Sequence, residues 1–374
     1  MKAIGIILAG GKSKKMGVLT ERRALAAMPI AGSYRLIDFA ISSMSHSKIK
    51  TVAVLTQYNS RSLNQHMNSA KWWDFGRKQG GLYVFSPTQT KTNSSWYRGT
   101  ADAMYQNLDF LVNNHEPYVV IASGDCIYKI DFDKVLDYHV EKDADITIIT
   151  KEMKPGTNLS QYGIVQVDEN NRITDLEEKP INPASNIAST GIYVIRRRLL
   201  IELLQAAAEE DKVDFVNDIL VRNKVNKKLY SYPLDTHWDK VSDVESYFNL
   251  NKAFLDKETR DFYFKQYPEI KTKIDDNPPA KYNPGSKVSN SLVSSGCIIN
   301  GVVEDSVLFK QVFVGSNVTI KNCVIMNDVY IYDNVHLENC IVEAHSTIKG
   351  GEELIGKDGI KVVDEKSERF VFRG

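Results

Sequence analysis

The first residues that could do chemistry form a glycine-containing stretch close to the N-terminus. It follows a short apolar run and reads Leu8-Ala9-Gly10-Gly11-Lys12-Ser13-Lys14-Lys15-Met16. Two glycines directly after a strand let the backbone approach a phosphate closely, with amides pointing at the anion. By itself, the pattern is equally compatible with an ordinary tight turn.

Five further short motifs follow this glycine loop along the chain. In order they are Trp96-Tyr97-Arg98-Gly99-Thr100-Ala101-Asp102-Ala103, Ser123-Gly124-Asp125-Cys126-Ile127-Tyr128, Tyr162-Gly163-Ile164, Glu177-Glu178-Lys179-Pro180 and Ser189-Thr190-Gly191-Ile192-Tyr193. Together they resemble the ADP-glucose pyrophosphorylase (glucose-1-phosphate adenylyltransferase) family, over almost the whole chain. The resemblance implies the reaction of ATP and glucose 1-phosphate, with magnesium, to ADP-glucose and pyrophosphate in bacterial glycogen synthesis.

That reaction is an attack of a sugar-phosphate oxygen on the α-phosphorus of ATP. Catalysis of such transfers consists mostly of positioning and of neutralising the charge that develops. A site of this kind therefore needs a glycine loop for the nucleotide, cations on the triphosphate and carboxylates that hold magnesium.

Several positions depart from the family's pattern on the triphosphate side. The family's loop reads Gly-Gly-x-Gly-x-Arg, whereas this chain has Ser13 in place of the third glycine and Lys15 in place of the arginine. Serine adds a Cβ, and lysine lacks the bidentate fork of arginine. The family's Arg-Ala-Lys-Pro-Ala-Val-Pro stretch carries a lysine that contacts phosphate, and Leu25 stands at that position.

The metal side is altered as well. Where the family reads Tyr-Trp-Lys-Asp-Val-Gly-Thr, with the aspartate as a magnesium ligand, this chain has Lys240 at the aspartate position. An ammonium ~4 Å from a dication is repelled by about 4 kcal/mol per pair of unit charges at an effective dielectric of 20. Neighbouring Asp239 is a poor substitute, because adjacent side chains of an extended segment point to opposite faces. Asp125 keeps the other ligand position, unless it only caps or pairs locally, so Mg²⁺ is expected but weakly bound.

The sugar-phosphate side matches the family position by position. The matching residues are Tyr97, Gly163, Glu178, Lys179 and Ser189. A lysine supplies a cation for phosphate, a glutamate accepts from sugar hydroxyls, and a glycine permits close approach. A solvated Glu-Lys pair is the simpler alternative. On the nucleotide side, the resemblance assigns a degraded site to Leu8, Ala9, Gly10, Gly11, Gly99 and Thr100.

This combination resembles the GlgD-type second subunit that accompanies a catalytic GlgC-type subunit in some bacteria. It predicts a regulatory, non-catalytic or weakly catalytic chain in a hetero-oligomer, expected to be a tetramer, with glucose 1-phosphate or ADP-glucose as possible ligands. Two rivals remain open. One is an active adenylyltransferase that uses Asp239 or Asp243 for the metal, and the other is a sugar-phosphate-sensing or scaffolding protein outside any pyrophosphorylase.

The elements that must position these residues alternate along the first 250 residues. Apolar, β-rich runs occupy 3–8, 51–55, 118–122, 146–150 and 191–195, and helical patterns occupy 99–113, 133–142 and 198–210. Continuous apolar strands separated by helices predict a doubly wound α/β domain with a mostly parallel sheet. Ligands bind at the carboxyl ends of such strands.

A different texture begins after a polar helix expected at 249–267 and a linker at 275–285. Small apolar residues recur every six positions, as in Val312, Val318 and Val324, and the residues between them favour turns. This period predicts a left-handed parallel β-helix with a triangular coil, although a β-meander is the alternative. We therefore expect three parts: an α/β domain at 1–250, a helix and linker at 251–285 and a β-helix at 286–374.

Composition narrows the classes of protein that remain. Forty-seven basic and 47 acidic side chains balance, which argues against nucleic-acid binding. The basic cluster Lys12, Lys14, Lys15, Arg22 and Arg23 is either an anion-effector site or a solvated face. Four cysteines without a CxxC pair suggest neither zinc nor disulfides. No run reaches the ~20 apolar residues of a membrane span, so a cytoplasmic location is expected.

Overall fold

The computed structural model describes residues 2–11, 13–76, 80–89 and 95–365. It divides into two compact units, one made of Met1–Gly11 and Phe39–Asp239 and the other of Lys12–Asp38 and Lys240–Gly374. By contacts, an N-terminal segment thus groups with the C-terminal part of the chain. The three-part division expected at residues 250 and 285 stays a prediction.

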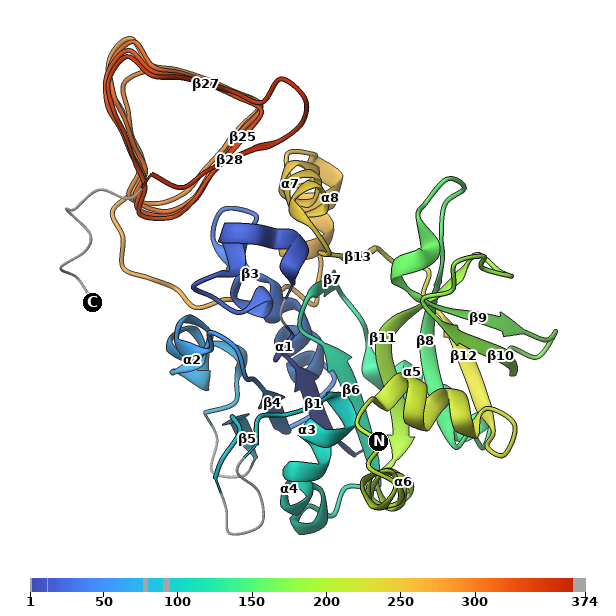
Figure 1. The fold of residues 1–374 in the computed structure, drawn as a ribbon. Helices are drawn as coiled ribbons and strands as arrows, with labels where there is room; N and C mark the ends of the chain where they lie inside the picture. Colours follow the sequence, from blue (N-terminus) through green and yellow to red (C-terminus); the bar gives the residue numbers. More distant parts are fainter. Residues whose placement is uncertain (1, 12, 77–79, 90–94, 366–374) are drawn as a thin grey trace. The chain divides into compact units, whose positions relative to one another are not determined.

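A mixed sheet forms the centre of the first unit (Figure 1). Its main path runs β10-β9-β11-β6-β1-β4-β5, with β8 beside β11 and β12 beside β8. The strands are β1 (Ala3–Leu8), β4 (Thr51–Leu55), β5 (Gly81–Phe85), β6 (Tyr118–Ser123), β8 (Ile146–Glu152), β9 (Gly163–Val167), β10 (Ile173–Glu178), β11 (Ile187–Arg196) and β12 (Leu229–Pro233).

The strands β6, β1 and β4, expected from the continuous apolar runs, are parallel; β5, which was not expected, is parallel to β4, and β8 is parallel to β12. The long strand β11 is antiparallel to both β6 and β8, and β9 and β10 form an antiparallel hairpin. All five predicted strands are present, with β1 and β4 at the predicted bounds.

Helices cover both faces of this sheet. On one face, α3 (Thr100–Gln106), α6 (Arg197–Glu209) and the π-helical turn η5 (Phe215–Val221) pack on the apolar cluster that includes Ile4 and Ile6. On the other face, a Cβ added to Gly5 would lie 2.5 Å from Met44 Sδ in α1 (Leu36–His46). The start of helix α5 (Phe132–Glu141) lies at the C-terminal end of α1, where the amide of Phe132 donates to Ser47 Oγ at 2.8 Å.

The single helix predicted at 99–113 is wrong, because the chain forms α3 and α4 (Leu108–Asn113) instead. Asn107 causes the break. Its side-chain Nδ2 donates to the Ala103 carbonyl at 2.8 Å, and its own amide donates to Met104, one residue short of the α-helical partner.

Three five-stranded parallel sheets form the β-helix of the second unit, which has the predicted triangular outline (Figure 1). The first contains β14 (Lys281–Tyr282), β17 (Ile298–Ile299), β20 (Phe313–Val314), β23 (Tyr330–Ile331) and β26 (Thr347–Ile348). The second contains β15 (Lys287–Ser289), β18 (Val302–Glu304), β21 (Thr319–Lys321), β24 (His336–Glu338) and β27 (Glu353–Ile355). The third contains β16 (Leu292–Val293), β19 (Val307–Leu308), β22 (Val324–Ile325), β25 (Cys340–Val342) and β28 (Lys361–Val363).

Corners of this left-handed coil are set by asparagine and aspartate residues in the left-handed backbone region. Asn317 and Asn334 have φ of 56° and 62°, and Asn317 Nδ2 donates to Asn334 Oδ1 at 2.9 Å in the next coil. Between corners, Val312 and Val318 of the six-residue series point inward and belong to the buried core, whereas the third member, Val324, lies outside that core cluster, which contains its neighbours Cys323 and Ile325 instead. The meander alternative is therefore wrong, because each strand pairs in parallel with the next coil.

The rest of the second unit consists of short elements from both ends of the chain. They are η1 (Lys14–Thr20), η2 (Leu25–Ala27), β2 (Pro29–Ile30), β3 (Tyr34–Arg35), α7 (Val244–Ala253) and α8 (Lys257–Phe264). The one helix expected at 249–267 is thus two, because Asp256 starts α8 by accepting from the amide of Thr259 at 2.8 Å. The predicted linker at 275–285 includes β14.

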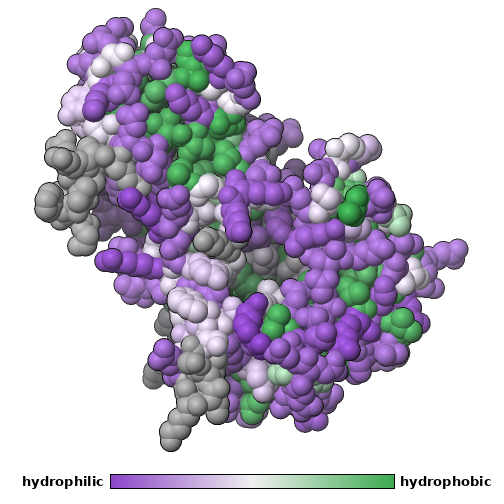
Figure 2. Space-filling view, viewed as in Figure 1, coloured by the Kyte–Doolittle hydropathy of each residue, from purple (hydrophilic) through white to green (hydrophobic). Residues whose placement is uncertain are grey.

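Two further features concern the helices and the surface of the molecule. Among the described residues, every helix is too short or too polar to cross a membrane. Figure 2 shows a largely hydrophilic face with scattered hydrophobic residues over the α/β unit, whereas hydrophobic residues gather over the end of the β-helix seen in that view.

Candidate functional site

The glycine loop begins at the carboxyl edge of the parallel strands. Beyond β1, the Ala9 amide donates to the Leu55 carbonyl at 2.8 Å, and the Gly124 amide donates to the Leu8 carbonyl at 3.0 Å. A Cβ added to Gly11 would meet nothing within 4 Å. The predicted nucleotide residues Leu8, Ala9, Gly10 and Gly11 therefore lie beside β4 and β6 at the edge where such folds bind ligands.

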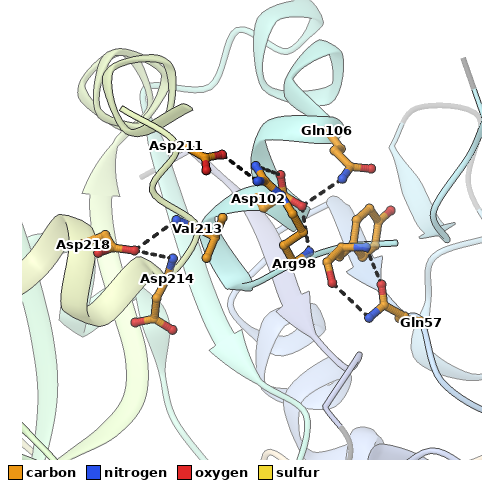
Figure 3. A network of polar contacts seen from close by, with 9 residues as sticks. Gln57, Arg98, Asp102, Gln106, Asp211, Val213, Asp214 and Asp218 are labelled. Atoms are coloured by element: carbon orange, nitrogen blue, oxygen red, sulfur yellow. Dashed lines mark hydrogen bonds and ion pairs between the residues drawn. The ribbon is translucent and has the colours of Figure 1, made fainter. Parts of the chain in front are cut away.

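Gln57 connects this loop to the first tyrosine motif. A Cβ on Gly10 would lie 3.5 Å from Gln57 Cβ. The Tyr97 amide donates to Gln57 Oε1 at 2.6 Å, and Gln57 Nε2 donates to the Tyr97 carbonyl at 3.1 Å (Figure 3). The Tyr97 ring is buried, and its hydroxyl accepts from Asn107 Nδ2 at 2.9 Å. Burial raises the pKa of Tyr97, and the bond from Asn107 opposes that rise.

The N-terminus of α3, with the predicted nucleotide residues Gly99 and Thr100, is bonded to a distant loop. The amides of Ala101 and Asp102 donate to the Val213 carbonyl at 2.8 and 3.2 Å. A Cβ on Gly99 would lie 2.3 Å from the same carbonyl oxygen, so this close approach requires glycine. These two amides therefore form hydrogen bonds within the protein and do not point at open solvent.

Four of the five predicted sugar-phosphate residues meet at the β9–β10 hairpin and β11. Gly163 pairs with Glu178 across the hairpin, and a Cβ on Gly163 would lie 2.9 Å from Glu178 Oε2 and 3.5 Å from Ser189 Cβ. Lys179 Nζ lies 3.0 Å from Glu178 Oε1, and the two side chains are 59% and 16% exposed. An exposed ammonium beside a sheltered carboxylate suits a phosphate next to sugar hydroxyls.

Local backbone shape sets the directions of these side chains. Lys179 has φ of 52°, and its amide donates to the Tyr162 carbonyl at 3.0 Å. In β11 the register shifts between Ser189 and Ile192, where Gly191 has φ of 75°. The irregularity leaves Ser189 Oγ 3.5 Å from the Tyr193 hydroxyl.

Tyr193 and Phe215 were missed as candidates at this group. Their rings meet edge to face with centroids 5.3 Å apart. Tyr193 could have been found, since it ends the same motif as Ser189, whereas Phe215 carries no local signal. Tyr97 was predicted with the sugar group, but its hydrogen bonds lead to Gln57 and Asn107.

Asp125 stands between β6 and β7 (Cys126–Tyr128). Its Oδ1 accepts from Ser123 Oγ at 2.5 Å and from Cys126 Sγ at 3.3 Å. No cluster of three or more His, Cys, Asp or Glu side chains with metal-binding geometry occurs in the described part of the chain. This donor set fits a Mg²⁺ ion that takes one carboxylate from the protein and further oxygens from substrate phosphates.

The two alternative carboxylates differ in their surroundings. Asp239 contacts solvent, yet desolvation by the surrounding protein raises its pKa more than His237, Lys154 and Lys151 lower it. In the second unit, Asp243 caps α7, accepting from the Ser246 amide at 2.8 Å.

Partial burial raises the pKa of Asp243, but hydrogen bonds from Ser246 and Ser242 outweigh this effect and hold it below the usual value. The Asp243 carboxylate is thus already committed to a capping box, since the Ser246 hydroxyl also accepts from the Asp243 amide at 3.0 Å.

The remaining altered positions lie in the second unit. Ser13 has extended φ of −104°, and its hydroxyl donates to the Ser242 carbonyl at 3.1 Å. Lys15 is exposed, whereas Leu25 is only 7% exposed within η2. Lys240 ends β13 (Trp238–Lys240) and is half-buried. Lys12 of the predicted basic cluster lies outside the described residues.

Comparisons with known proteins match almost the whole chain. A family model described as "Nucleotidyl transferase" matches residues 4–257, and one described as "GlmU-like, C-terminal hexapeptide" matches residues 278–371. A glucose-1-phosphate adenylyltransferase of Clostridium acetobutylicum is 40% identical over 321 residues, covering 85% of this chain and 84% of its own length. The chain belongs to the glucose-1-phosphate adenylyltransferase family.

Other relatives of that name give the same result. The protein of Geobacillus stearothermophilus is 38% identical over 325 residues, covering 86% of this chain and 83% of its own. That of Thermosipho africanus is 39% identical over 320 residues, covering 85% and 77%. The resemblance in the motifs is therefore confirmed at the level of the family.

Proposed function

We propose that this chain is a regulatory subunit of a glucose-1-phosphate adenylyltransferase, with weak or no catalysis of its own. It binds glucose 1-phosphate or ADP-glucose at the β9–β11 group and assembles with a catalytic homologue in the cytoplasm. Its magnesium binding is weaker than that of a catalytic chain.

One contrast carries the proposal. Four of the five residues predicted to bind sugar phosphate, Gly163, Glu178, Lys179 and Ser189, lie together. Leu25, at the position where the family has a phosphate-binding lysine, is instead a buried apolar side chain. Lysine at 240 in place of a carboxylate removes one negative charge and adds a positive one, which opposes a dication.

Assembly is supported by the β-helix. A solenoid buries its faces only by stacking, and its ends need polar caps to remain soluble alone. Hydrophobic residues gather at the end visible in Figure 2, which favours a partner there.

Activity measurements test the proposal. Formation of ADP-glucose from ATP, glucose 1-phosphate and Mg²⁺ would be measured for this chain alone, for a catalytic homologue alone and for their mixture. We expect little activity alone and a changed rate or effector response in the mixture. Robust activity alone would refute the regulatory role, and an unchanged partner would favour a separate sensor.

Binding and restoration variants sharpen the result. Lys179→Met should weaken glucose 1-phosphate binding, whereas Lys134→Met, an exposed lysine on α5, should not. Leu25→Lys combined with Lys240→Asp should raise activity if those two positions limit turnover. No gain would place the defect elsewhere.

A further inference from the structure

Residues 213–215 form a short segment that follows α6, includes the first residue of η5 and touches the start of α3 (Figure 3). The Val213 carbonyl accepts from the amides of Ala101 and Asp102, and Gly99 lies against the same oxygen. Because a Cβ on Gly99 would lie 2.3 Å from the Val213 carbonyl oxygen, the segment and the start of the helix approach more closely than any residue other than glycine would allow. The Val213 carbonyl therefore fixes the 213–215 segment to the start of α3, where the predicted nucleotide residues Gly99 and Thr100 lie.

Side chains hold the amides of the same segment. The Asp218 carboxylate accepts from the Val213 amide at 3.0 Å and the Asp214 amide at 2.8 Å. The Thr100 hydroxyl accepts from the Phe215 amide at 2.9 Å. The bond from the Asp214 amide, followed by that from Val213, lowers the pKa of Asp218, although partial burial opposes the shift. Three consecutive amides thus donate to two side chains.

The far end of the segment reaches the sugar-phosphate group. The Phe215 ring packs edge to face on Tyr193, whose hydroxyl lies 3.5 Å from Ser189 Oγ. The turn η5, which Phe215 begins, also packs beside β10, the strand that ends in Glu178. A shift of Phe215 would therefore be transmitted through Tyr193 to Ser189, and through the packing of η5 on β10 to Glu178.

We propose that Asp218 and Thr100 are positioning residues for sugar-phosphate binding. They fix the 213–215 segment before ligand arrives, and the segment holds Phe215, Tyr193 and Ser189 in place. The inference rests on the proposed binding of glucose 1-phosphate. When the binding residues are already ordered before the ligand arrives, no conformational entropy is lost in ordering them at binding. Affinity therefore depends also on side chains that never touch the ligand.

Titration of the full chain with glucose 1-phosphate tests this role. Asp218→Leu should weaken affinity on the order of tenfold, and Asp218→Asn less, because its amide oxygen still accepts. Thr100→Val, nearly isosteric, removes one acceptor and should weaken affinity by a few fold. Since both residues act through the same segment, the Thr100→Val, Asp218→Asn double variant should lose less than the product of the single losses.

Asp211→Asn is the matched control. Asp211 pairs with Arg98 at 2.6 Å beside the segment, but its side chain is 80% exposed and holds none of the three amides. The affinity of the Asp211→Asn variant for glucose 1-phosphate should equal that of the native chain. Hydrogen exchange should rise at Phe215 and Ala101 together in the Asp218 variants, and not in Asp211→Asn.

The outcomes separate the two ideas. Absence of binding by the native chain would refute the sugar-phosphate ligand itself. Native binding with unchanged affinity in Thr100→Val and Asp218→Asn would overturn the positioning role alone, even if thermal stability fell. If Asp218→Leu does not fold, the other two variants still decide.

Discussion

The ion pair between Arg23 and Glu343 joins the N-terminal part of the second unit to the β-helix. Arg23 Nη2 donates to Glu343 Oε1, and Arg23 Nη1 lies 3.4 Å from Met326 Sδ. The two side chains are 14% and 2% exposed, so the pair is largely desolvated. Arg23→Met keeps the length and apolar body of the side chain but removes its charge.

The expected cost follows from which partner is more deeply buried. Arg23→Met leaves the Glu343 carboxylate inside the protein without its guanidinium, and breaking a buried pair in this way costs about 3–5 kcal/mol. Glu343→Gln removes the buried charge and keeps an acceptor, so its cost should be about 1–2 kcal/mol. The double variant should be more stable than Arg23→Met alone.

Urea unfolding of the full chain at pH 7, followed by far-UV circular dichroism, gives these free energies from the transition that reports the second unit. The matched control is Lys265→Met, which breaks the more exposed pair with Asp261 in α8 and should cost under about 1 kcal/mol. If Arg23→Met costs no more than this control, or if the two single costs add in the double variant, the argument from burial is refuted.

Three further predictions concern the rest of the chain. Burial lowers the pKa of His139 to about 4, so the unfolded state takes up the proton first and stability falls as pH drops from about 6.5 towards 4. Urea unfolding at pH 7 and pH 5 should show a loss of roughly 2 kcal/mol that His139→Gln lacks. Gly99→Ala forces a methyl group towards the Val213 carbonyl and should lower stability by about 1–3 kcal/mol in thermal unfolding, whereas Gly11→Ala, with open space around it, should change it little. Asp243→Ala removes the cap of α7 and should cost about 1 kcal/mol, measured by the same urea titration.

Local pattern was sufficient for much of the fold. The strands at 3–8 and 51–55 were predicted at their observed bounds, because a buried parallel strand needs an unbroken apolar run. The β-helix was predicted from a six-residue period. Each repeat contributes one short strand and one corner, and each strand points an apolar side chain inward. The motifs around Gly163, Glu178 and Ser189 also named residues that the fold brings together.

The ends and breaks of helices were harder to predict from the sequence, because single side chains determine them. Asn107 interrupts a helical pattern by bonding to the Ala103 carbonyl, and Asp256 starts a second helix where one had been expected. Neither residue changes the apolar periodicity of its segment, which is the only signal that the sequence offers there.

Sequence by itself determined the family, the two kinds of architecture and the identity of the candidate ligand-binding residues. Only the tertiary structure decided what several of those residues touch. Arg23 is part of a basic cluster in sequence, yet it is paired with a glutamate 320 positions away. Gly99 and Thr100 meet a segment more than a hundred residues further along. Such contacts depend on how distant segments pack, and residue type and spacing carry no record of that packing.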